Sequence, residues 1–159
     1  MTIKAGIIGC GHIGKRHAAV LDDSEHYTVN ALDDIIPDKA RDLAGLYSIN
    51  NVFSNYKEFL NSDIQLVSIC TPHYLHKEMA ISAMKAGKDV VVEKPMALSA
   101  KDAREMSSTA EELNRKLFVI KQNRFNVPIR LTEEAIRDKK LGKIFSLYQT
   151  GYFTIQSLN

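Results

Sequence analysis

Three glycines near the amino terminus, Gly9, Gly11 and Gly14, follow the spacing G-x-G-x-x-G and limit the fold more than any other feature. An apolar run over residues 3–8 precedes them, and a segment predicted to be helical follows. In that context the first glycine permits a tight turn, the second lets a pyrophosphate approach the backbone, and the third lets the helix pack closely on a strand. The motif predicts a strand–turn–helix unit that binds a dinucleotide at the positive end of the helix dipole.

Apolar and amphipathic segments alternate along the rest of the chain. We expect strands at residues 3–8, 27–32, 51–53, 64–70, 89–92 and 117–121. We expect helices at 12–21, 37–44, 56–60, 76–86, 100–116 and 129–139, the second of them stopping near Gly45 and the fifth capped by Ser99. Alternation with short connections predicts an α/β fold, a doubly wound parallel sheet of the Rossmann-like dinucleotide-binding type.

Composition excludes several classes of function. Apolar residues make up 45% and charged residues 25% of the chain, and 21 basic residues are interspersed among 19 acidic ones. This mixture gives no basic stripe, which argues against binding to nucleic acid or to a membrane. Two cysteines, Cys10 and Cys70, form neither a disulfide framework nor a metal-binding spacing, so we expect reduced thiols in a cytoplasmic protein and no metal.

Asp34 follows Gly9 by 25 positions, close to where this fold places its ribose-binding acid. A carboxylate there can accept hydrogen bonds from both ribose hydroxyls and would repel a 2′-phosphate. Ile35 and Ile36 supply no arginine to bind such a phosphate. The pattern favours NAD over NADP, although Asp33-Asp34 can also be interpreted as a solvated turn.

Distinctive residues follow four of the predicted strands, at Cys10-Gly11-His12, Cys70-Thr71-Pro72-His73, Glu93-Lys94-Pro95 and Gln122-Asn123-Arg124. The carboxyl ends of parallel strands share one edge, where ligands bind in such sheets. Proline restricts the residue before it to extended conformations, so Lys94 is expected to be aimed at this edge. A surface lysine in a turn is the alternative.

The histidines allow two interpretations each. His76 suits the start of a helix better than direct catalysis. His12 and His17 flank the glycine loop, where each would either contact the ligand or lie on a helix face. No Ser/His/Asp or Cys/His pairing and no zinc-like spacing is evident.

Several motifs occur together in one order: Gly9-x-Gly11-x-x-Gly14-x-x-His17, Thr71-Pro72-x-x-x-His76, Ala86-Gly87-Lys88, Glu93-Lys94-Pro95 and Gln122-Asn123-Arg124-Phe125. Together they resemble the N-terminal domain of the Gfo/Idh/MocA oxidoreductases. The segment 121–126 resembles the branch that oxidises the 3-hydroxyl of a UDP-N-acetylated hexosamine or its uronic acid.

The resemblance implies roles for individual residues. Gly9, Gly11, His12, Ile13 and Gly14 would hold the pyrophosphate of NAD, and Asp34 the ribose. Thr71, Pro72 and His76 would line the cofactor cleft. Glu93 and Lys94 would lie at the nicotinamide, with Lys94 as the catalytic residue hydrogen-bonded to the sugar or nucleotide-sugar hydroxyl that is oxidised. Gln122 and Arg124 would help to close the site.

Members of this family are about twice as long, with a C-terminal substrate domain built on a mostly antiparallel sheet. We therefore expect a dinucleotide-binding domain at residues 1–142, followed at 143–159 by a crossover strand and the stub of a missing domain. Such a truncated chain would bind NAD, turn over sugars poorly or not at all, and self-associate through residues 143–155. The alternative function is a non-catalytic dinucleotide-binding module or regulator.

Overall fold

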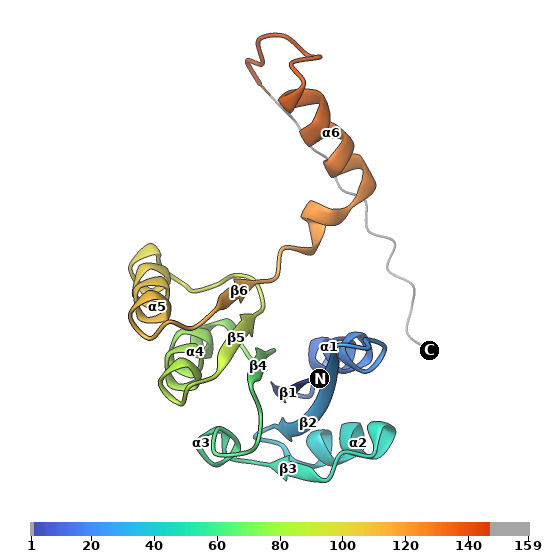
Figure 1. Ribbon diagram of the computed structural model, residues 1–159, viewed down its shortest axis with the longest axis vertical. Coiled ribbons are helices and arrows are strands. Elements are labelled where there is room, and N and C mark those ends of the chain that lie inside the picture. Colours follow the sequence, from blue (N-terminus) through green and yellow to red (C-terminus); the bar gives the residue numbers. More distant parts are fainter. Residues whose placement is uncertain (1, 147–159) are drawn as a thin grey trace. The chain divides into compact units, whose positions relative to one another are not determined.

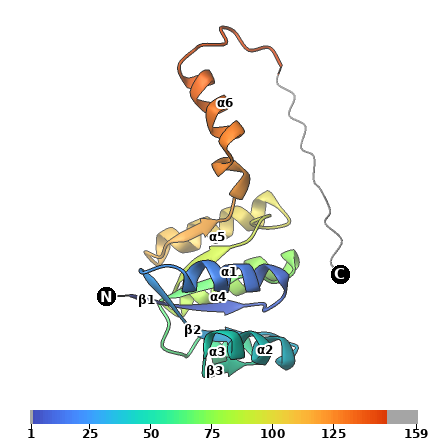
Figure 2. The ribbon, with the colours of Figure 1, turned by 90° about the vertical axis from the view of Figure 1, so that its right-hand side faces the viewer.

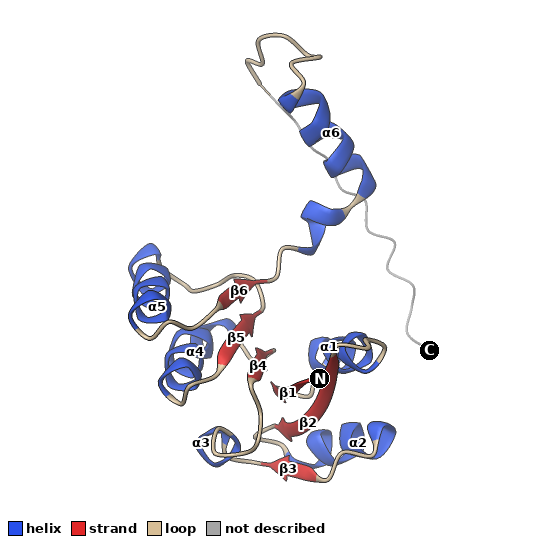
Figure 3. Ribbon diagram, viewed as in Figure 1, coloured by secondary structure: helices blue, strands red, loops and turns tan. Residues whose placement is uncertain are grey.

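The computed structural model describes residues 2–146 and contains a six-stranded parallel sheet (Figures 1 and 3). The strand order is β3-β2-β1-β4-β5-β6. The strands are β1 (Ile3–Ile8), β2 (Tyr27–Asp33), β3 (Asn51–Phe53), β4 (Leu66–Ile69), β5 (Asp89–Val92) and β6 (Leu117–Val119). Every pair of neighbours runs parallel. The predicted doubly wound sheet is confirmed.

Helices cover both faces of the sheet. They are α1 (His12–Asp22), α2 (Pro37–Tyr47), α3 (Tyr56–Phe59), α4 (His76–Lys85) and α5 (Ala100–Glu112). Figures 1 and 2 show α1 and α2 on one face and α3, α4 and α5 on the other. Each face buries its own apolar cluster, centred on Ile7, Leu32 and Leu43 under α1 and α2, and on Phe59, Val67 and Met106 on the opposite side.

Contacts divide the chain into two units, Met1–Lys121 and Gln122–Asn159. The first unit holds the whole sheet. In the second, a short 3-10 turn, η2 (Gln122–Phe125), precedes α6 (Val127–Arg137), whose apolar residues Val127 and Leu131 are exposed. The domain boundary at residue 142 stays a prediction.

Helices α2, α5 and α6 differ from the prediction by two residues or more, and α6 is Val127–Arg137 where 129–139 was expected. Helix α2 continues through Gly45 to Tyr47 and ends at Ser48, which adopts a left-handed conformation. Helix α5 stops at Glu112, short of residue 116, and Asn114 then takes a positive φ of 51°. Residues 143–146, where the predicted crossover strand would begin, are not in a strand, and the rest of the predicted segment, 147–159, lies outside the described residues.

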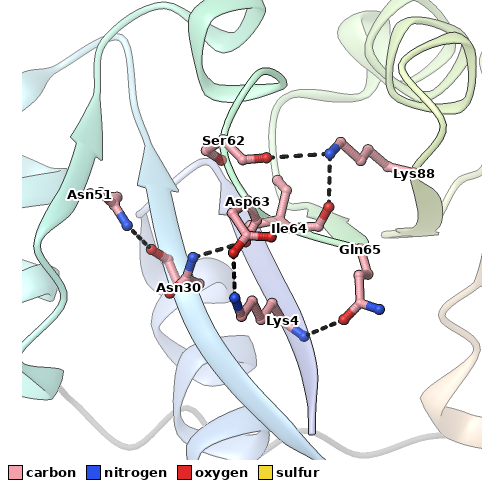
Figure 4. Close-up of polar contacts among 8 residues, drawn as sticks. All are labelled: Lys4, Asn30, Asn51, Ser62, Asp63, Ile64, Gln65 and Lys88. Atoms are coloured by element: carbon pink, nitrogen blue, oxygen red, sulfur yellow. Dashed lines mark hydrogen bonds and ion pairs between the residues drawn. The ribbon is translucent and has the colours of Figure 1, made fainter.

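Polar side chains hold the loop before β4 in place, at the end of the sheet where β4 and β5 begin (Figure 4). Lys88 Nζ donates to the carbonyl of Ile64 at 2.8 Å, and Asn30 Nδ2 donates to the carbonyl of Asp63 at 2.9 Å. Lys4 on β1 pairs with the Asp63 carboxylate. These contacts satisfy main-chain carbonyls in the loop before β4 and fix where that strand enters the sheet.

The amino-terminal end of α1 packs directly on the turn that follows β1. A Cβ added at Gly14 would lie 1.9 Å from the carbonyl oxygen of Gly9 and 3.0 Å from its carbon. Gly9 has a φ of +92°, and a Cβ there would lie 2.7 Å from the carbonyl oxygen of Cys70. Both glycines are therefore required by the backbone, and the packing role predicted for Gly14 is confirmed.

We expect Gly14→Ala to lower the free energy of unfolding by more than about 3 kcal/mol, because its methyl group would meet main-chain atoms that cannot move independently. Urea denaturation followed by circular dichroism measures this loss. Gly45→Ala is the control, since a Cβ at Gly45 meets no atom within 4 Å. In a helix interior alanine is more stable than glycine by roughly 0.5–1 kcal/mol. Equal stabilities for the two variants would contradict the close packing.

Asp33, the last residue of β2, is buried with an exposed fraction of 4%. Its Oδ1 atom has no hydrogen-bond partner among the described residues. Burial, and then the neighbouring Asp34 carboxylate, raise the pKa of Asp33 from 3.8 to about 6. Its contribution to stability is therefore full below pH 3.8 and is lost as the pH rises through about 6.

Asp33→Asn should consequently raise the free energy of unfolding at pH 8, by an amount on the order of 2 kcal/mol, because the amide carries no charge into the core. The difference from wild type should shrink as the pH is lowered to 5. Thermal melts at several pH values measure it, with Asp42→Asn on the exposed side of α2 as the matched control. A gain that does not depend on pH would rule out a buried ionised Asp33.

Candidate cofactor site

The amino terminus of α1 is open to a ligand. Gly11 is its N-cap residue, and no side chain caps the helix. No acidic residue occupies the first turn, and a Cβ added at Gly11 would meet no atom within 4 Å. His12 and Ile13 are exposed at this end. Free N–H groups and the positive end of the helix dipole therefore face open space, which is an arrangement suited to an anion such as a pyrophosphate.

Asp34 lies beside this opening, and it is not a solvated turn residue. Its exposed fraction is 9%. Oδ2 accepts a hydrogen bond from the main-chain N–H of Cys10 at 2.8 Å, and Oδ1 accepts one from that of Ile36 at 2.8 Å. The carboxylate thus holds the glycine loop against the end of β2. Each oxygen keeps a further lone pair with which to accept a ligand hydroxyl.

The loops after β1 and β4 touch where the strand order reverses. The backbone at Gly9 lies against Cys70 and Thr71. As predicted, β1 and β4 are neighbours, which brings Cys10 and Cys70 to adjacent strand ends. Both are free thiols, and burial raises the pKa of each to about 12, so both stay protonated and unreactive at neutral pH.

His76 is fully buried at the first position of α4. Its Nδ1 lies 2.8 Å from the carbonyl oxygen of Pro95, and its Nε2 lies 3.0 Å from that of Thr71. The ring therefore joins the loop after β4 to the loop after β5. Because the ring is buried, it can affect a ligand only by holding these two loops in place. In the loop after β4, Thr71 is half-buried and Pro72 is exposed.

Glu93 and Lys94 follow β5 directly. The side chain of Lys94 is exposed, and its ammonium group makes no hydrogen bond or ion pair with residues 2–146. Its main-chain N–H donates to Glu93 Oε2 at 3.1 Å. The Glu93 side chain is only 14% exposed. One strand end therefore combines a fixed carboxylate with a cation that is available to a ligand.

The structure also shows a partly buried group of polar side chains that the sequence did not predict. His17 on α1 contacts Ser68 on β4 through Nδ1 at 2.6 Å and Glu93 through Nε2 at 3.2 Å. Of the two interpretations of His17, the structure agrees with a position on a helix face. His17 lies one turn after Gly14, on the side of α1 that packs on the sheet. Gln122 belongs to the second unit, so its role in the site stays a prediction.

A hollow of about 500 Å³ lies between α5 and β6 and is lined by residues that include Ser107, Glu111 and Asn114. None of the predicted site residues lines it. Among residues 2–146, no cluster of His, Cys, Asp and Glu is arranged to hold a metal ion. Nor does any helix in that part of the chain have the length and apolarity needed to cross a membrane.

Comparison with known proteins identifies a family of oxidoreductases. A model of the Gfo/Idh/MocA oxidoreductase family, NAD-binding Rossmann fold, matches residues 3–121. Inositol 2-dehydrogenase of Rhizobium meliloti is 31% identical over 144 residues, which are 91% of this chain and 43% of that protein. The chain thus spans less than half the length of this relative.

Solved structures agree in fold. The WlbA dehydrogenase of Bordetella pertussis, in complex with NADH and UDP-GlcNAcA, superposes with a TM-score of 0.87 at 30% identity, covering 91% of this chain and 45% of that one. The scyllo-inositol dehydrogenase of Lactobacillus casei, with bound NAD(H) and scyllo-inositol, gives 0.84 at 27% identity over 89% and 43% of the two chains. The chain belongs to the Gfo/Idh/MocA oxidoreductase family, of which it carries the NAD-binding Rossmann domain.

Proposed function

We propose that this chain is the cofactor-binding part of an NAD-dependent oxidoreductase that acts on a hydroxyl group of a sugar, an inositol or a nucleotide sugar. The observation that carries the proposal is the uncapped amino terminus of α1, open at Gly11 and flanked by the buried carboxylate of Asp34. Free N–H groups suit the pyrophosphate, and the carboxylate suits ribose hydroxyls.

Within this proposal Gly9, Gly11, His12, Ile13 and Gly14 form the pyrophosphate site. The loop at Thr71-Pro72, held by His76, borders it. When bound, NAD accepts the hydride that leaves the substrate carbon. Lys94 would contact the hydroxyl of that carbon, and its exposed side chain at the end of β5 supports this role.

The class of substrate is inferred from the relatives, which include dehydrogenases of inositol, glucose 6-phosphate and levoglucosan. Structural neighbours solved with UDP-GlcNAcA support the nucleotide-sugar branch suggested by residues 121–126. A non-catalytic dinucleotide-binding module would need the same glycine loop and Asp34. It would not need a cation free at the end of β5, which favours the oxidoreductase.

We expect the chain to bind NADH at least about tenfold more tightly than NADPH, because Asp34 would repel a 2′-phosphate.

Gly11→Ala should weaken NADH binding by at least about tenfold without changing the melting temperature, because its methyl group occupies only the open space meant for the pyrophosphate. Fluorescence titration with the reduced cofactors measures both, against a low background in a chain without tryptophan.

Gly45→Ala is the matched control, since its added methyl group also meets nothing within 4 Å but lies on α2. It should leave NADH binding unchanged. Binding of neither cofactor by the wild-type chain would overturn the proposed function. Tighter binding of NADPH would overturn the role given to Asp34 while leaving the fold and the glycine loop in place.

Self-association through residues 143–155 and a cytoplasmic location complete the proposal. Ile144 and Phe145 are 41% and 85% exposed, and both cysteines are free thiols as suits a reducing compartment. We expect Phe145→Ser to reduce the fraction of dimer or higher oligomer in sedimentation velocity, because it removes apolar surface from the proposed contact. A wild-type chain that remains monomeric at high concentration would contradict self-association.

A further inference from the structure

Three side chains close to the carboxyl ends of the central strands form a hydrogen-bonded group. His17 comes from α1, Ser68 from β4 and Glu93 from the end of β5. Ser68 is 2% exposed, and the side chains of His17 and Glu93 are 16% and 14% exposed. Polar groups buried to this degree are costly unless each finds a partner, so their arrangement calls for a reason.

One assignment of protons satisfies every contact in the group. Neutral His17 donates from Nε2 to Glu93 Oε1 at 3.2 Å, and its Nδ1 accepts the hydroxyl proton of Ser68 at 2.6 Å. Ser68 Oγ can then accept from the Cys70 thiol at 3.7 Å. Glu93 Oε2 accepts the main-chain N–H of Lys94 at 3.1 Å. Both oxygens of Glu93 are therefore held by the protein.

The order serine, histidine, carboxylate resembles the arrangement of a nucleophilic hydrolase, but the burial excludes that chemistry. A nucleophilic hydroxyl must reach a substrate atom, whereas Ser68 lies within a central strand and is almost inaccessible. In this chain the serine instead orients the imidazole. Of the three residues, Glu93 is the one that follows a strand, and Lys94 comes directly after it.

We propose that His17 is a positioning residue, which fixes the carboxylate of Glu93 and, through it, the main chain at Lys94. The proposal rests on the proposed function, in which Lys94 contacts the reacting hydroxyl, and on the family resemblance, which implies that Glu93 lies at the nicotinamide. Without His17, Glu93 Oε1 would lose its partner, and the carboxylate would be free to turn toward the ammonium group of Lys94 or into the space for the ligand. The side chain of His17 makes its hydrogen bonds to Ser68 and Glu93, and among the described residues none joins it to Asp34 or to the glycine loop. Its effect should therefore be confined to the nicotinamide end.

Two substitutions separate this role from a general effect on folding. In His17→Asn the shorter amide can reach Ser68 but not Glu93, whereas in His17→Gln the longer amide can place a donor near the position of Nε2. Each variant is titrated with NADH and with ADP-ribose, which shares every part of the cofactor except the nicotinamide. His26→Asn, at an exposed position before β2, serves as the control.

We expect His17→Asn to weaken NADH binding by about fivefold and to change ADP-ribose binding by less than about twofold. His17→Gln should restore NADH binding to within about twofold of wild type. Equal losses for both ligands, unchanged NADH binding in His17→Asn, or failure of His17→Gln to recover would overturn the positioning role. Failure of the wild-type chain to bind either ligand would instead overturn the proposed function.

Discussion

The contact between the start of α1 and the turn after β1 is the constraint on which the rest of the site depends. Because Gly14 has no side chain, the helix packs so close to the carbonyl of Gly9 that even a methyl group would not fit between them. That approach sets the position of the helix end at Gly11 and, one turn later, brings His17 over the central strands. A helix held further away would lose both arrangements at once, because a helix moves as a rigid body over a single turn.

Two buried carboxylates, Asp33 and Asp34, and the partly buried Glu93 follow or end strands at the same end of the sheet, and their hydrogen-bond partners differ. Main-chain N–H groups hold both oxygens of Asp34, and a histidine and a main-chain N–H hold those of Glu93. Asp33 has one oxygen without a partner. Concentrating acidic groups where solvent is scarce opposes folding, and such costs are typical of sites that are kept for binding. The apolar clusters on the two faces of the sheet offset this cost.

Local pattern predicted the sheet, the order of its elements and the turn at Gly9, because each depends on residues close together in sequence. The end of α2 was predicted wrongly, since burial of Leu43 and Ala44 outweighs the weak helix preference of Gly45. The contacts of His17 join residues 51 and 76 positions apart, and they depend on how the helix is rotated on the sheet. No spacing in a single sequence carries that information.

The strand order also sets the distance between two residues of the proposed site. Asp34 follows β2 and Lys94 follows β5, and the two strands between them are β1 and β4. At about 4.8 Å per strand, three spacings separate these positions by roughly 14 Å across the sheet. A ligand that reaches both Asp34 and Lys94 must therefore extend across three strand spacings, a length that the order of the strands sets.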